Sequence, residues 1–220
     1  QVADLISLWP ESVIPKTRLW ITENITKAKF ENIGLSLRLA PGSTEPVTHL
    51  AWEFDDASVR FMKTLPPVTS GAGYGEVSGN ALTVVVQKGA ITAATGGDVD
   101  VTDTVLRIAQ LDVKPATLDV QLSTSSSVEA ALSLVEQKPF YALKNAAFGP
   151  DVAQGQVQLQ GKLGVPLVKK ITLEDVGFNV TGDITAVSSD QLLQGKVLQS
   201  PRMALALDRT GLSLTGQVDV

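Results

Sequence analysis

One feature constrains the fold more than any other: apolar and polar residues alternate along most of the chain. The alternation is clearest at residues 33–39, Ile-Gly-Leu-Ser-Leu-Arg-Leu, and it returns in residues 118–122, 157–159, 203–207 and 212–214. Successive side chains of a β-strand point to opposite faces, so a period of two predicts strands with one apolar and one polar face. The sequence therefore predicts a mainly β protein. It leaves open whether a core or a ligand covers the apolar face.

Composition narrows the class of partner. The 220 residues are enough to bury a sizeable core, and the net charge of -5 with no basic run argues against nucleic acid. The chain has no cysteine, which excludes disulfides and thiolate metal sites. No apolar stretch approaches the roughly 18 residues that a membrane-spanning helix needs. Because the sequence begins at Gln1 with no targeting segment, we expect a piece of a longer protein.

The first 27 residues predict a helical lead-in. Residues 5–9 suit one helical turn that Pro10 would stop, and residues 16–27 place apolar side chains at helical spacing. We expect a short amphipathic helix there. From residue 28 the period changes to two, so a single domain over residues 1–220 should consist of this lead-in and a sheet over residues 28–220.

A second helix is predicted near the middle of the chain, over residues 127–137. Ser126 and Glu129 have the spacing of a capping box, and Pro139 would end the helix. After Pro139 the sequence predicts short strands separated by turn residues. The expected fold is one long antiparallel sheet with this amphipathic helix inserted after its middle.

Glycine and proline mark the expected turns. The run from Gly71 to Gly75 resembles a phosphate-binding loop, but its third glycine lies one position short of the GxGxxG pattern. A hairpin arm leading to a turn at Gly79 and Asn80 is the better interpretation. The Leu65-Pro66-Pro67 segment cannot lie inside a central strand, because proline lacks the N–H that the ladder needs.

No convincing catalytic centre emerges. Asp98, Asp100 and Asp103 could bind calcium, although the first two alternate with valines and fit the polar side of a strand. His49, the only histidine, has no recognisable nucleophile or acidic partner for a triad. We therefore expect a protein that is not an enzyme and that needs no cofactor or metal.

The three tryptophans allow two interpretations. Trp9, Trp20 and Trp52 could anchor the protein at a membrane interface, where an amphipathic ring is favoured. Three isolated tryptophans more often belong to a core, and we favour that interpretation.

Several motifs together suggest a family. In the first half they are Leu8-Trp9-Pro10, Arg18-Leu19-Trp20-Ile21 with Asn24-Ile25, residues 56–61 and Leu65-Pro66-Pro67. In the second half they are the helix 127–137 with Lys138-Pro139, residues 155–163 with Pro166-Leu167, residues 204–207 and residues 211–216. This set resembles the central domain of YhdP-like proteins, which belong to the AsmA-like superfamily together with TamB.

The resemblance implies a sheet curled into a trough, or β-taco, within the periplasmic portion of an inner-membrane-anchored protein of Gram-negative bacteria. Such a segment would help carry phospholipid between the inner and outer membranes along an aliphatic groove. Its expected partners are phospholipid acyl chains and the remaining segments of the parent protein. Membrane contact would come only through parts of the parent chain outside this sequence.

Alternation alone selects the candidate groove residues. They are Ile33, Leu35, Leu37, Leu39, Leu82, Val84, Val86, Leu118, Val120, Leu122, Val157, Leu159, Leu205, Leu207, Leu212 and Leu214. Two alternatives remain open at this point. The predicted helix 127–137 could seal the apolar face into an ordinary core, or the chain could be an envelope scaffold that binds protein partners along sheet edges. A carbohydrate-active domain has little support, because aromatic residues make up only 5% of the sequence.

Overall fold

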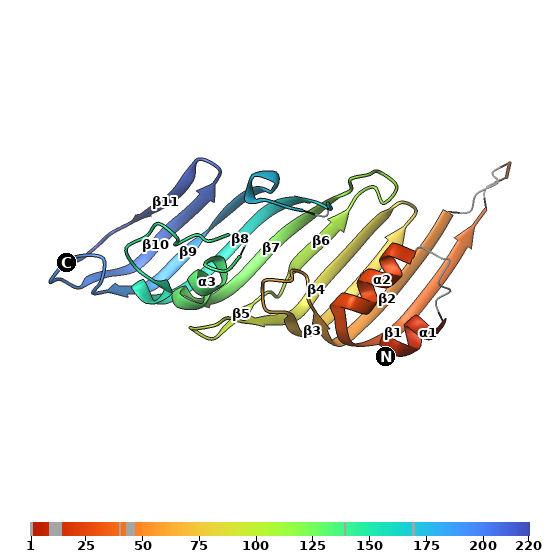
Figure 1. The fold of residues 1–220 in the computed structure, drawn as a ribbon, viewed down its shortest axis with the longest axis horizontal. Helices are drawn as coiled ribbons and strands as arrows, with labels where there is room; N and C mark the ends of the chain where they lie inside the picture. The colour runs from red at the N-terminus through yellow and green to blue at the C-terminus, as the bar shows by residue number, and fades with distance from the viewer. Residues whose placement is uncertain (1, 9–14, 40, 43–46, 139, 169) are drawn as a thin grey trace.

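A computed structural model describes residues 2–8, 15–39, 41–42, 47–138, 140–168 and 170–220. It is mainly β, and its strands form one 11-stranded antiparallel sheet (Figure 1). This confirms the predicted fold class. The strands are β1 Ile25–Arg38, β2 Val47–Val59, β3 Val68–Ser78, β4 Ala81–Thr92, β5 Asp98–Asp100, β6 Thr104–Ile108, β7 Thr117–Ser127, β8 Gln154–Pro166, β9 Gly177–Ser189, β10 Leu198–Asp208 and β11 Gly211–Gly216.

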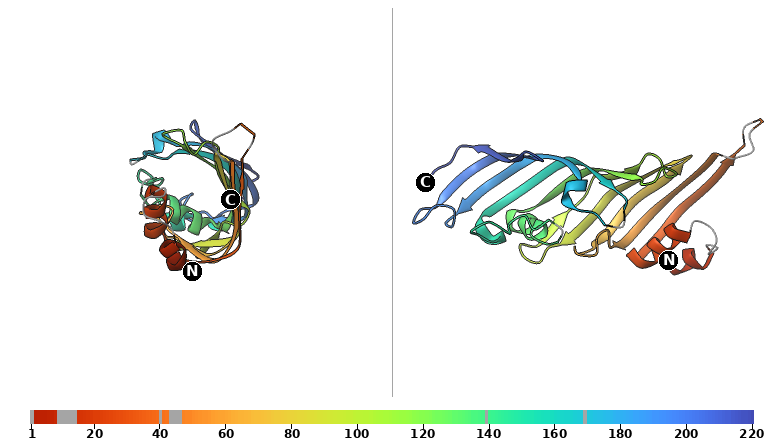
Figure 2. Two further views of the ribbon diagram at one scale, coloured as in Figure 1. Left: turned by 90° about the vertical axis from the view of Figure 1, so that its right-hand side faces the viewer. Right: turned by 45° about the horizontal axis from the view of Figure 1, so that its top comes forward.

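The strands follow one another across the sheet in nearly their chain order, from β1 to β11. The exception is at the centre, where β4 pairs with β5 through one end and with β6 through the other, and both pair with β7. Seen along its length, the sheet curls into an open trough (Figure 2). Right-handed twist between neighbouring strands accumulates over a sheet of this width and bends it in this way.

Two helices precede the sheet. They are α1, Val2–Leu8, and α2, Pro15–Asn24. The predicted helix over residues 16–27 ends early, because Ile25 already pairs with Val59 in the sheet. Its amphipathic character was predicted wrongly, since Leu19 and Trp20 are both exposed. The predicted stop at Pro10 lies outside the described residues.

The central helix α3 spans Val128–Val135, within the predicted range. Its N-cap is Ser127, whose side chain accepts a hydrogen bond from the Ala130 N–H at 3.0 Å. The predicted capping box of Ser126 and Glu129 is therefore wrong by one residue. Ser126 still belongs to β7, and its hydroxyl donates to the Ser127 carbonyl at 2.9 Å. The predicted end at Pro139 falls outside the described residues.

Strands after residue 139 are longer than the sequence predicts, reaching 13 residues in both β8 and β9. Glycines that suggested turns lie inside these strands. A Cβ on Gly161 would come 2.6 Å from the Asn179 carbonyl oxygen, and one on Gly182 would come 2.0 Å from that of Gln158. Glycine is required there because the neighbouring backbone approaches too closely for any side chain.

Turns in the first half follow the prediction. Gly79 and Asn80 connect β3 to β4 directly, and Leu65-Pro66-Pro67 lies in the connection between β2 and β3. The glycine run 71–75 is part of strand β3, so it does not form a phosphate-binding loop.

The sealed core is small and lies under α3. Its buried residues are Ile91, Ala93, Val99, Val101 and Ala130, with Val68, Val86 and Leu134 packed against them. Among the described residues, no large side chain is fully buried. Most of the sheet therefore depends on its ladder and on partial burial rather than on a closed interior.

Candidate functional site

The strand register collects the apolar side chains on one face of the sheet. Residues directly opposite each other in an antiparallel pair lie on the same face. One continuous row shows the pattern: Trp52, Gly75, Val84, Leu106, Val120, Leu163 and Phe178. A second row joins Leu159, Gly182, Leu205 and Leu214.

This register includes nearly all the predicted groove residues. They are Leu35, Leu37, Leu82, Val84, Val86, Leu118, Val120, Leu122, Val157, Leu159, Leu205, Leu207, Leu212 and Leu214. Ile33 has no partner in the ladder, because the register shifts between Glu31 and Gly34. Leu39 follows the last residue of β1. Both side chains are exposed.

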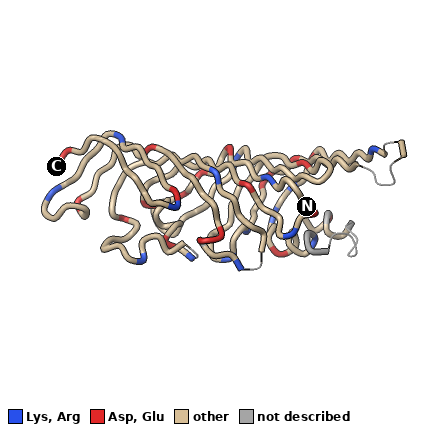
Figure 3. Tube along the Cα trace, turned by 90° about the horizontal axis from the view of Figure 1, so that it is seen from above, with Lys and Arg blue, Asp and Glu red and all other residues tan. Residues whose placement is uncertain are grey.

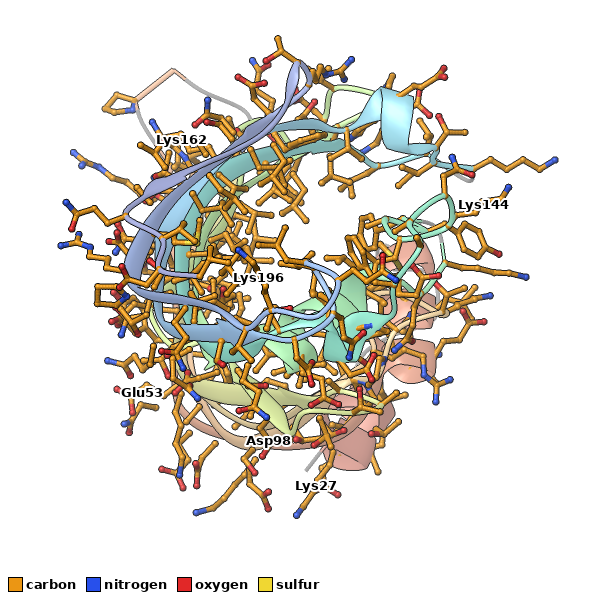
Figure 4. The ribbon with its side chains drawn as sticks, turned by 90° about the vertical axis from the view of Figure 1, so that its left-hand side faces the viewer. Lys27, Glu53, Asp98, Lys144, Lys162 and Lys196 are labelled. Atoms are coloured by element: carbon orange, nitrogen blue, oxygen red, sulfur yellow. The ribbon has the colours of Figure 1, made fainter. Side chains whose placement is uncertain are left out.

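The apolar face is the concave one. Glu53 and Lys162 belong to the opposite register, and Figure 4 shows their side chains pointing away from the hollow of the trough. We call the apolar side of the sheet, from Leu35 and Leu37 on β1 to Leu212 and Leu214 on β11, the concave face. The opposite side is the convex face.

Among the described residues, the positions that the ladder pairs on the concave side of β2 to β11 hold no charged side chain. The paired positions there hold aliphatic or aromatic residues, glycine, methionine, serine or threonine: Thr48, Leu50, Trp52 and Phe54 on β2; Gly73, Gly75 and Val77 on β3; Thr104, Leu106 and Ile108 on β6; Thr124 and Ser126 on β7; Gly161, Leu163 and Val165 on β8; Phe178, Val180, Gly182 and Ile184 on β9; Met203 on β10; and Gly216 on β11. Hydrocarbon can contact such a surface without stripping water from an ion.

Coverage of the concave face differs along the trough. In the middle, Val157 is buried on β8, which α3 contacts, and Val86 packs against the sealed core. At the two ends the face is open: the exposed fraction is 65% for Leu35 on β1 and 59% for Leu212 on β11. The two interpretations left open by the sequence, core or groove, therefore apply to different parts of the same face.

Contacts with the turn between β4 and β5 help to hold α3 in place. The Ser127 hydroxyl donates to the Gly96 carbonyl at 2.8 Å, and the buried Ser133 hydroxyl accepts from the Thr95 N–H at 3.2 Å. A Cβ on Gly96, which has φ of +79°, would lie 2.3 Å from the Ala130 nitrogen. The turn between β4 and β5 thus holds α3 against the trough from Ser127 to Ser133.

The aromatic part of the concave face was not among the predicted groove residues. Trp52 and Phe54 lie opposite Gly75 and Gly73, and Phe178 lies opposite Leu163. The alternation Leu-Ala-Trp-Glu-Phe at residues 50–54 was available as a signal. That Trp52 and Phe54 each lie opposite a glycine could be seen only from the register.

The convex face is polar and carries both signs of charge. Lysines, arginines and acidic residues are spread along the whole length of the chain (Figure 3). The Arg202 guanidinium donates two hydrogen bonds, at 2.8 and 2.9 Å, to the Asp183 carboxylate and holds the pKa of that carboxyl below its usual value. A shallow hollow of about 540 Å³ on this side is lined by residues that include Arg107, Asp119 and Lys162.

The residues considered for catalysis or metal binding do not form a common site. His49 is exposed on the convex register opposite Ser36 and Ser78. The carboxylate of Asp98 accepts from the Thr92 hydroxyl, and that of Asp100 accepts from the Thr102 N–H, both at 2.7 Å. Within the described ranges, no group of three or more His, Cys, Asp or Glu residues could hold a metal ion.

Comparisons with family models, with curated proteins and with solved structures find no match to this chain. No helix in the described part of the chain is long and apolar enough to span a membrane.

Proposed function

We propose that this chain is a non-enzymatic segment of a periplasmic, inner-membrane-anchored protein that carries phospholipid between the inner and outer membranes along its concave face. The observation that best supports this proposal is that the concave face is uncharged at its paired positions and is open at both ends of the trough. The motifs that resemble YhdP-like proteins of the AsmA-like superfamily support the same assignment.

The physical chemistry of the face suits acyl chains. Each methylene removed from water contributes about 0.8 kcal/mol, and an aliphatic surface offers no hydrogen bond that would hold a chain in one register. A phospholipid could therefore bind and still slide. Tight headgroup recognition would need converging arginine or lysine side chains, and the concave positions of the described ladder from β2 to β11 contain none. The charged headgroup would remain outside the concave face, in contact with water.

Mass spectrometry of lipids extracted from the protein purified from a Gram-negative host tests this proposal. A mock purification gives the background, and stoichiometric phospholipid is the expected result. Leu214→Asp and Ser213→Asp form a matched pair, since both residues are exposed neighbours on opposite faces of β11. Loss of lipid from the first variant only would support the concave face as the binding surface. Wild-type protein that holds no more lipid than the mock sample would contradict the proposal.

A second candidate is a structural scaffold of the cell envelope. It is favoured by the outer strands: β1 and β11 each have one neighbour in the described sheet, so each leaves an edge with unpaired backbone groups. A partner strand could add to either edge. A stable complex with an envelope protein that persists in Leu214→Asp, with no bound lipid in the wild type, would favour this function.

A further inference from the structure

One aromatic side chain on the concave face lies unusually close to the sheet backbone. Trp52 on β2 is directly opposite Gly75 on β3. A Cβ built on Gly75 would be 2.3 Å from the Cζ2 atom of the indole and 2.6 Å from its Cε2 atom. The ring therefore occupies the space where a side chain of residue 75 would stand.

Gly75 differs in this respect from Gly73 and Gly182. A Cβ on Gly73 would meet the Val85 carbonyl oxygen at 2.0 Å, and one on Gly182 would meet the Gln158 carbonyl at the same distance. Backbone approach requires glycine at those two positions. At Gly75 the three nearest atoms all belong to the Trp52 ring, so the indole alone accounts for the glycine.

The position of the ring affects the space in the trough. Side chains normally stand roughly perpendicular to a sheet, and an upright indole would project into the hollow. Lying over Gly75, the ring instead forms part of the floor, in the same row as Val84 and Leu106. It is half-buried, so part of its surface still faces the trough.

We propose that Trp52 is part of the surface over which acyl chains pass and that Gly75 sets the width of the groove at this point. A side chain at residue 75 would lift the indole from the floor and narrow the path. The inference rests on the proposed function, because it identifies residues that would determine access for the same ligand.

Fluorescence quenching tests the contact without any change at residue 75. A variant with Trp9→Phe and Trp20→Phe leaves Trp52 as the sole tryptophan. It is loaded from vesicles of phosphatidylglycerol brominated in its acyl chains, then separated from the vesicles by size exclusion. We expect bound lipid to quench at least about half of the Trp52 emission, because bromine quenches at contact. A matched variant with Trp9→Phe and Trp52→Phe reports Trp20 in helix α2 and should keep its emission.

Substitution tests the role of Gly75. We expect Gly75→Ala to lower the amount of bound phospholipid about tenfold, the effect typical of a change of about one methylene in an apolar pocket. Adding Trp52→Leu to Gly75→Ala removes the displaced ring and should restore binding. Circular dichroism checks that each variant is folded.

The outcomes separate this inference from the proposed function. Wild-type protein without phospholipid would overturn both. Bound brominated lipid that leaves Trp52 unquenched would overturn the inference alone, as would wild-type binding by a folded Gly75→Ala variant or failure of Trp52→Leu to restore it. If Gly75→Ala does not fold, the quenching experiment still tests whether acyl chains contact Trp52.

Discussion

The middle and the ends of the trough share the same alternating pattern of apolar and polar residues, but the apolar side chains are buried in the middle and exposed at the ends. In the middle, α3 lies over the junction of β4 and β5, and Val101 has an exposed fraction of 7%. At the β1 end, Leu35 continues the same apolar face with an exposed fraction of 65%. Alternation therefore defines a one-sided sheet, and the short helix α3 determines where the apolar side becomes part of a core. Stability should depend on the middle, and ligand binding on the open part of the face.

A charge in each region should give the largest contrast. Val101→Asp would bury an unpaired carboxylate and should cost about 4 kcal/mol or more, enough to unfold a marginally stable domain. Leu35→Asp places its charge in water and should change the free energy of unfolding by less than about 0.5 kcal/mol. Urea denaturation followed by circular dichroism measures both. Similar losses in the two variants would remove the distinction between core and open face.

Loosening α3 should give the next largest effect. Gly96→Ala brings a Cβ against the Ala130 nitrogen in a backbone conformation that favours glycine, and we expect a loss of about 2 kcal/mol. Ser127→Ala removes the N-cap and should cost about 1 kcal/mol. Thermal unfolding checks the order. Gly97→Ala is the control for the glycine, because it also has positive φ but open space around it.

The register can be tested at neighbouring residues on β4. Val84 lies on the concave face opposite Gly75, and Thr83 lies on the convex face opposite Glu76 and Arg107. Val84→Asp should lower lipid binding and cost about 1–3 kcal/mol, because it puts a charge on a half-buried apolar surface. Thr83→Asp should leave binding unchanged. Equal effects in the lipid assay would mean that the predicted faces are wrong.

The smallest effect should come from the convex face. Because Arg202 lowers the pKa of Asp183 in the folded protein, the pair contributes stability above the ordinary aspartate pKa. That contribution is lost as the pH falls and the carboxylate is protonated. Asp183→Asn should therefore be slightly less stable than the wild type at pH 7 and indistinguishable from it near pH 2. Both groups are exposed, so salt should weaken the difference. A difference that grows toward acid pH would contradict this assignment.

Local pattern predicted most of the architecture. Strand alternation at residues 118–122 and 212–214 identified the apolar side correctly, because side-chain direction has a period of two in any strand. The α3 helix was predictable from its apolar spacing, although its cap is at Ser127 instead of Ser126. Two hydroxyl residues in succession give the same local signal, and tertiary contact with Gly96 selects between them.

The prediction of turns from glycine was wrong at several positions. At Gly161 and Gly182 the sequence indicates turns, but close approach of a neighbouring strand keeps both residues inside long strands. At Gly75 the neighbour is an aromatic ring from a different strand. These causes lie across the ladder, at positions far away in the chain, so no local window contains them.

Residue pattern alone was enough to predict a one-sided β-sheet with few helices and a mixed-charge polar side. Those properties follow from residue type and spacing. The three-dimensional arrangement was needed to show that the apolar side is concave, that α3 covers its middle, and that its ends stay open. Curvature and coverage depend on cumulative strand twist and on long-range packing, which bring residues such as Val101 and Ala130 into one buried cluster although they are distant in sequence.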